Sequence, residues 1–125
     1  MGNRVKREQY DKKHLVIFET LPGETVLVAS GNGKIATGQV LSQKTDDGTW
    51  HKFNKAGTDG TELPRRVYKG EEELDTTSKE AIAVCVRAGA LDKSLVVGIT
   101  GTDYKAIAEL ERNGIYLEEV KNNVD

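Results

Sequence analysis

The sequence has few of the residues from which catalytic and metal sites are usually built. Its 125 residues include one cysteine, Cys85, and two histidines, His14 and His51. A lone cysteine excludes an internal disulfide framework and a cysteine-based zinc site, and neither histidine has a second ligand at metal-binding spacing. No Gly-x-Ser-x-Gly or similar nucleophile motif is present. The sequence therefore predicts a protein that is not an enzyme and has no cofactor or metal.

An excess of charge of one sign and long apolar runs are lacking too. There are 18 Lys and Arg residues against 20 Asp and Glu residues, which gives a net charge of -2. Dedicated nucleic-acid binders are usually basic, so we expect no direct nucleic-acid partner. No apolar run approaches the ~20 residues of a membrane-spanning helix, and the polar start is unlike a signal peptide. We expect a soluble single domain with a real core and no membrane partner.

Proline is scarce, with 2 residues, whereas glycine is abundant, with 13. This balance favours short strands joined by tight turns. Ser30–Gly33 predicts a hairpin turn, because Asn-Gly accepts the positive φ that such turns need, and 46–48 predicts another turn. Strands are expected at 15–18, 25–29, 34–41, 49–53, 67–68, 81–88 and 115–117, and one helix at 103–113. The pattern predicts a β-rich α+β fold.

Some of these elements carry sharper expectations. Gly38 inside 34–41 suggests a bulge or bend. The nearly continuous apolar run 81–88 indicates a strand buried on both faces, with Cys85 packed as a small hydrophobe. Thr102 is the predicted N-cap of the helix, and Ile107 and Leu110 are its predicted core stripe.

Three other segments have a plain structural interpretation. Ser30–Lys34 lacks the first glycine and the Ser or Thr of a phosphate-binding loop. The acidic run Glu71–Glu73 with Asp75 is interpreted as part of a solvated loop, 71–79. Trp50 and Phe53 are expected in the core or in a subunit contact.

The order of several segments resembles the head decoration proteins of tailed phages, the lambda-type capsid-stabilising proteins. Gly33–Leu41 matches a Gly-Lys-apolar-x-x-Gly-x-Val-Leu pattern, and an aromatic segment, Trp50–Phe53, follows it. Next come an Asp-Gly-Thr-Glu loop at 59–62, a strand at 81–89 and a helix that ends in Leu-x-x-x-Gly-Ile at 110–115. The resemblance runs from about Leu21 to Leu117.

The resemblance implies a β-tulip-like body, 21–125 with a polar C-terminal tail, preceded by an extended N-terminal arm, 1–20. It implies a homotrimer at three-fold and quasi-three-fold sites on the outside of an expanded capsid. There the protein would cement capsomers against the pressure of packaged DNA. The implied partner is the major capsid protein, and the implied location is the virion, after synthesis in the bacterial host cytoplasm.

The arm suits strand addition to the capsid, because a basic stretch precedes the β-prone segment Leu15–Phe18. Trp50 and Phe53 are the candidate trimer contacts, since aromatic residues are enriched at interfaces. The candidate capsid-binding residues of the arm are Arg4, Val5, Arg7, Tyr10, Leu15, Val16, Ile17 and Phe18.

Two alternatives stay open at this point. A small β-barrel module for single-stranded nucleic acid or carbohydrate would need Trp50, Phe53, Lys52 and Lys55 exposed on one face. A hydrolase based on His51 or His14 would need a second catalytic group, which the sequence does not place.

Overall fold

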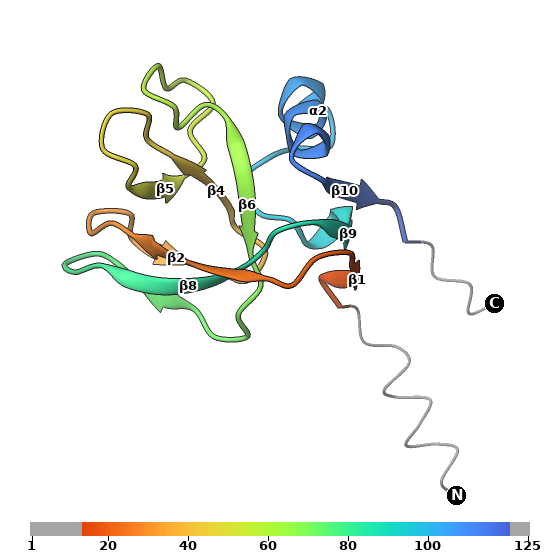
Figure 1. Cartoon of the computed structure of the whole chain (residues 1–125), viewed down its shortest axis with the longest axis horizontal. Helices are drawn as coiled ribbons and strands as arrows, with labels where there is room; N and C mark the ends of the chain where they lie inside the picture. The colour runs from red at the N-terminus through yellow and green to blue at the C-terminus, as the bar shows by residue number, and fades with distance from the viewer. Residues whose placement is uncertain (1–13, 121–125) are drawn as a thin grey trace, which may run out of the picture.

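The computed structural model describes residues 14–120 and confirms a β-rich α+β fold (Figure 1). Five strands close into a barrel, and a three-stranded sheet and an α-helix lie against one side of it. The elements in chain order are β1 (Val16–Glu19), β2 (Glu24–Val28), β3 (Lys34–Ile35), β4 (Val40–Gln43), β5 (Trp50–Lys52), β6 (Pro64–Tyr68), β7 (Leu74–Asp75), β8 (Ala81–Val86), β9 (Gly89–Asp92), the 3-10 helix η1 (Lys93–Leu95), α2 (Tyr104–Arg112) and β10 (Ile115–Glu118).

The barrel has the strand order β2-β5-β4-β6-β8. β2 pairs with β8 along its whole length, from Glu24 opposite Cys85 to Val28 opposite Ala81. On its other side, β2 pairs with β5 at one position, Val28 opposite Trp50. The barrel is therefore closed by a seam that is much weaker than its other strand pairs.

Two hydrophobic clusters share the barrel strands. Neighbouring residues of a strand point to opposite faces, so β4, β6 and β8 contribute to both clusters. The cluster inside the barrel contains Val26, Val28, Ile35, Leu41, Tyr68, Ala83 and Cys85. The cluster between the barrel and the outer layer contains Leu15, Val40, Val67, Val86, Leu91, Leu110 and Ile115. Each fully buried aliphatic side chain contributes about 1.5–3 kcal/mol of burial free energy, so the first cluster stabilises the barrel and the second holds the outer layer against it.

The predicted hairpin at Ser30–Gly33 is wrong. β3, which follows the turn, pairs with β7, whereas β2 pairs with β8 and β5. The predicted strand 34–41 is in fact divided into β3 and β4. Gly38 lies between them with φ +94, and a Cβ there would overlap the carbonyl oxygen of Leu95. The glycine therefore marks a change of sheet rather than a bulge within one strand.

The expectation that 81–88 is buried on both faces is wrong for most of the strand, because both faces are covered only at Cys85 and Val86. β8 alternates, with Ala83 and Cys85 inside the barrel and Ile82 67% and Val84 38% exposed. The region 71–79 contains the short strand β7, and the strand β9 was not predicted.

The predicted helix is confirmed, with small corrections. Its N-cap is Asp103 rather than Thr102, and its buried residues are Ala106 and Leu110, while Ile107 is half-buried. Asp103 accepts hydrogen bonds from the Thr100 backbone (3.1 Å) and from Lys55 Nζ (2.7 Å). The hydrogen bond from Lys55 is the main reason why the pKa of the Asp103 carboxyl lies below its ordinary value.

Candidate functional site

The three-stranded sheet β1-β9-β10 brings both ends of the described chain to one side of the molecule (Figure 1). β1 runs antiparallel to β9, and β10 runs parallel to β9 on its other side. Within residues 14–120, β1 and β10 have no second strand partner. Their outer edges therefore offer backbone N–H and C=O groups to an added strand.

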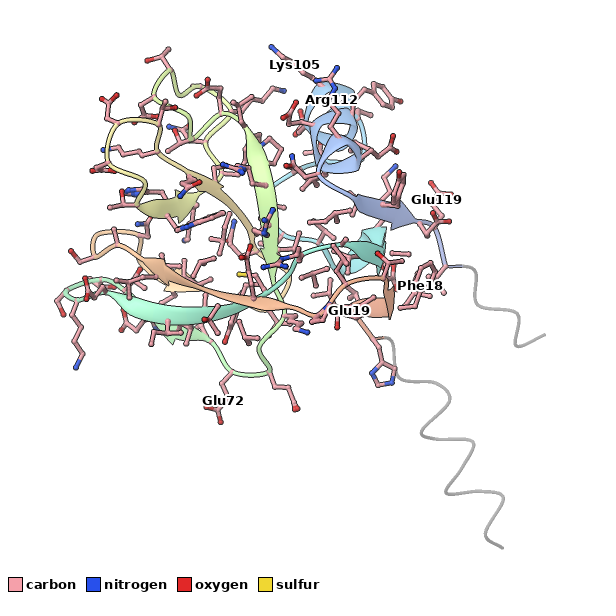
Figure 2. The ribbon with its side chains drawn as sticks, in the orientation of Figure 1. Phe18, Glu19, Glu72, Lys105, Arg112 and Glu119 are labelled. Atoms are coloured by element: carbon pink, nitrogen blue, oxygen red, sulfur yellow. The ribbon has the colours of Figure 1, made fainter. Side chains whose placement is uncertain are left out.

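An apolar row crosses the face of this sheet that points away from the core. Phe18 and Tyr116 both lie opposite Ala90 in the strand register, so the three side chains share a face. Phe18 is 56% and Tyr116 49% exposed, whereas Ala90 between them is buried. Figure 2 shows Phe18 on the side of the molecule that carries β1 and β10. We call Phe18, Ala90 and Tyr116 the outer row; it is an exposed apolar stripe flanked by two open strand edges.

A cavity of about 390 Å³ opens where β9 and β10 end. Asp92, one of its lining residues, is buried and accepts hydrogen bonds from the backbone N (3.0 Å) and the hydroxyl (2.8 Å) of Ser94. Leu117 and Val120 supply part of its apolar wall. The cavity lies at the end of the sheet, and no residue of the outer row lines it.

The predicted arm residues fall into three groups. Arg4, Val5, Arg7 and Tyr10 lie outside the described residues. Leu15 is buried in the outer cluster, and Val16 packs against it. Ile17 and Phe18 are exposed, at 45% and 56%. Val16–Glu19 therefore form β1 of the three-stranded sheet, with Leu15 buried just before it, and the role of these residues in capsid binding stays a prediction.

Trp50 and Phe53 do not come together. Trp50 lies at the barrel seam, with the guanidinium groups of Arg65 and Arg66 at 6.0 and 5.9 Å from its ring centroid. Phe53 packs against the outer cluster and lines a hollow beside α2. The two rings thus lack the shared exposed face that a base-stacking or sugar-stacking platform requires.

The surroundings of Trp50 include an ion-pair network that the sequence reasoning missed. Glu24 pairs with Arg66 and, at 3.2 Å, with Arg87. Burial disfavours the Glu24 carboxylate, but the hydrogen bonds and positive charges of Arg66 and Arg87 together outweigh burial and lower its pKa. The consecutive arginines 65 and 66 were the signal available in the sequence, but pairing with Glu24 depends on the β2 and β6 positions in the barrel.

His51 takes part in a hydrogen-bond chain that orders the β4–β5 hairpin. Asn32 Nδ2 lies 3.1 Å from His51 Nδ1, and His51 Nε2 lies 2.8 Å from Thr49 Oγ1. Thr49 Oγ1 in turn donates to Asp47 at 2.7 Å. With Asn32 donating to Nδ1, the ring proton sits on Nε2 and is donated to Thr49. His51 therefore cannot accept the Thr49 proton, so the chain does not form a nucleophile–base pair.

Other chemistry is sparse in the described part of the chain. Cys85 is buried, as predicted, and desolvation raises the pKa of its thiol to about 12. No group of three His, Cys, Asp or Glu side chains within residues 14–120 could hold a metal ion. Neither helix found over the same range has the length and apolar character needed to cross a membrane.

Comparison with known proteins assigns the chain to a family. The family model of the bacteriophage lambda head decoration protein D matches residues 6–115, which is most of the sequence. A search of the curated proteins gives no match. The protein therefore belongs to the lambda head decoration protein D family and is a structural component of the phage head, located on the capsid.

Proposed function

We propose that this protein binds the outer surface of an expanded phage capsid as a homotrimer, at three-fold and quasi-three-fold sites, and cements neighbouring capsomers. Its direct partner is the major capsid protein. The observation that carries the proposal is the outer row between two open strand edges, on the side where both described chain ends lie. In this arrangement the three-stranded sheet faces the shell.

Residues 1–13 and the exposed part of β1 supply the binding arm in this proposal. The segment before His14 contains Arg4, Lys6, Arg7, Lys12 and Lys13 against Glu8 and Asp11, so it is attracted to an acidic capsid surface. Strand addition at β1 or β10 gives main-chain hydrogen bonds, while Phe18 and Tyr116 fill apolar pockets. Three such arms on one trimer offset the ordering cost of each arm through effective concentration.

Co-sedimentation with expanded, undecorated capsids of the host phage tests the proposal. The wild type should saturate at about three copies per three-fold site, as a homotrimer requires. A truncation that starts at His14 is the appropriate arm deletion, because removing residues 1–20 would also remove β1 and the buried Leu15. We expect this truncation to keep its fold and to lose at least about tenfold in affinity.

Phe18→Ser tests the sheet face separately from the arm. Phe18 is exposed, so the variant should unfold like the wild type but bind shells at least about tenfold more weakly. Tyr104→Ser is the matched control, because Tyr104 is 71% exposed on α2, away from the sheet face. Wild-type binding by both the truncation and Phe18→Ser would contradict the proposed orientation.

A further inference from the structure

A groove of about 510 Å³ follows the weak seam of the barrel. Its floor and walls come from β2 on one side and from β4, β5 and β6 on the other. Trp50 and Arg65 lie on one wall, and Thr25 and Leu27 lie on the other. This groove is separate from the three-stranded sheet that the proposed function turns toward the shell.

The backbone of β2 is open toward this groove. The Ala29 amide donates to the Trp50 carbonyl at 3.0 Å, so the backbone groups of Ala29 face β5. Successive residues of a strand direct their backbone N–H and C=O groups to opposite sides. The backbone groups of Leu27 and Thr25 therefore face the same side as those of Ala29. Within the described residues no strand pairs with β2 there beyond Val28. A chain segment entering the groove therefore meets the backbone of Thr25, which has no strand partner on that side within the described residues, as well as side chains.

The side chains of the groove are those that dominate protein–protein contacts. Tryptophan and arginine are the residues most enriched at binding hot spots. Arg66 is neutralised by Glu24, whereas Arg65 donates to the neutral Gln43 amide oxygen at 2.8 Å and has no carboxylate partner within residues 14–120. Arg65 therefore presents an unneutralised positive charge beside the Trp50 ring, which suits a carboxylate on a partner.

An apolar surface continues from the groove over the outside of the barrel. Leu27 lies opposite Ile82, and Thr25 lies opposite Val84, in the β2–β8 register. Leu27 is 47% and Ile82 67% exposed. A cation at the rim of an exposed apolar strand pair fits a protein surface that carries acidic side chains.

The chain itself carries such a surface in the loop Gly70–Glu73. Glu71, Glu72 and Glu73 are exposed, and of these only Glu73 has a lysine nearby within the described structure, Lys34 at 4.0 Å. The loop is held in shape by the β3–β7 pairing and by a 2.6 Å hydrogen bond from Tyr68 Oη to the Glu72 carbonyl. Figure 2 shows Glu72 projecting from the lower end of the molecule.

We propose that the groove is a contact between copies of this chain, in which Arg65 of one copy binds the acidic loop of the next. This inference rests on the trimer of the proposed function and names the surfaces that build it. Groove and loop are different surfaces, so the contact is heterologous and closes into a ring when repeated about a three-fold axis. Charge complementarity between an unneutralised arginine and three exposed glutamates sets the direction of docking.

Charge exchange tests the contact. Arg65→Glu and the double variant Glu71→Lys/Glu72→Lys should each weaken trimer formation at least about tenfold, because like charges then face each other. Combining all three changes in one chain should restore trimer formation to within about threefold of the wild type. Trimers are measured by sedimentation equilibrium, and Lys105→Glu on the exposed face of α2 is the control for an equal charge change (Figure 2).

A cysteine pair gives a second readout, in solution and on decorated shells. Oxidation of Arg65→Cys/Glu72→Cys should yield covalent trimers, whereas either single cysteine should give no species larger than a dimer. The native Cys85 should not interfere, because it is buried and its thiol pKa is raised to about 12.

Each outcome is decisive for one of the two proposals. A combined variant no better than the single ones, or wild-type trimers in Arg65→Glu, overturns the contact and leaves shell binding intact. Weaker shell binding of Arg65→Glu with unchanged trimers means that the groove meets the capsid, which also overturns the contact. A wild type without trimers in sedimentation equilibrium, together with a cysteine pair that gives no covalent trimers in solution or on decorated shells, overturns the trimer itself. Failure of shell binding alone contradicts only the proposed function.

Discussion

At the residue scale, Asn32 shows how one side chain can join segments that are distant in the sequence. It donates to the Ala29 carbonyl at 2.9 Å and accepts from the Lys52 amide at 3.0 Å. Its remaining amide hydrogen is directed to His51. These bonds fix the Asn32 amide orientation, which in turn keeps His51 neutral, since a protonated ring would place two donors face to face.

This arrangement predicts that stability falls in mild acid. Burial and, to a smaller extent, the positive charge of Lys44 lower the pKa of His51 below its ordinary value of 6.5. The unfolded chain then binds more protons than the native state below pH 6.5, so the free energy of unfolding decreases as pH drops through that range. Urea unfolding at about pH 7.5 and about pH 5.5 measures the decrease. In His51→Gln the difference between the two pH values should shrink; an unchanged difference would assign it to other groups.

At the element scale, the crossing between β3 and β4 depends on Gly38. Its amide donates to the Tyr68 carbonyl at 2.8 Å, and its own carbonyl accepts from the Val97 amide at 2.7 Å. The positive φ of Gly38 turns the chain out of the β3–β7 pair, and it enters the barrel at Val40. The Leu95 carbonyl comes so close at this turn that it leaves no room for a Cβ. A conformational glycine thus separates two strands that an apolar pattern joins.

Gly38→Ala should be strongly destabilising. A left-handed alanine costs about 1–2 kcal/mol, and the clash with backbone at Leu95 adds to it, so we expect a loss of about 3 kcal/mol or more. Gly31→Ala is the matched control, because Gly31 has a similar φ of +87 but nothing within 4 Å of a Cβ. It should cost about 1 kcal/mol. Equal losses in denaturant unfolding would show that the backbone conformation, rather than the clash, sets the cost.

At the scale of the whole molecule, the barrel and the outer layer cannot separate without exposing the cluster that lies between them. β4, β6 and β8 each place one residue in the inner cluster beside one in the outer cluster, as with Leu41 and Val40. The sheet face proposed to meet the shell is therefore braced by the barrel through Leu91, Leu110 and Ile115. A rigid body of this kind suits a load-bearing role between capsomers.

This view predicts a measurable gain in shell strength. Saturating expanded capsids with the protein should raise the temperature at which they rupture, because a ligand bound only to the intact shell stabilises it by mass action. Dye accessibility of the packaged DNA on heating reports rupture. The gain should disappear with the Phe18→Ser variant and persist with Tyr104→Ser. Full occupancy of the capsid sites without any rise in the rupture temperature would argue against cementing.

The local parts of the structure could be predicted from the sequence. The helix at 104–112 follows from its local pattern, and Gly114 ends it with φ +90. The burial of Cys85 follows from its apolar neighbours, and the order of several motifs was enough to indicate the family. Each of these depends on residues close together in the chain, where propensity and hydrogen-bonding rules act directly.

Pairing between distant segments could not be predicted in the same way. Asn-Gly at 32–33 has hairpin chemistry, but the strand after it pairs with β7 because that register buries Ile35 inside the barrel. β8 has an apolar run, yet on its outward face only Val86 is buried, whereas Ile82 and Val84 are exposed. Trp50 and Phe53 lie three residues apart yet pack in different places.

The sequence by itself therefore determined the fold class, the late helix, the sparse catalytic chemistry and the resemblance to decoration proteins. The tertiary structure decided that Leu15 belongs to the core, that the Phe18–Tyr116 row faces outward and that Arg65 lies over Trp50 beside an open edge of β2. The physical reason is that strand propensity and apolar pattern are short-range, whereas a strand's neighbours and its exposed face are selected by the burial of the whole chain.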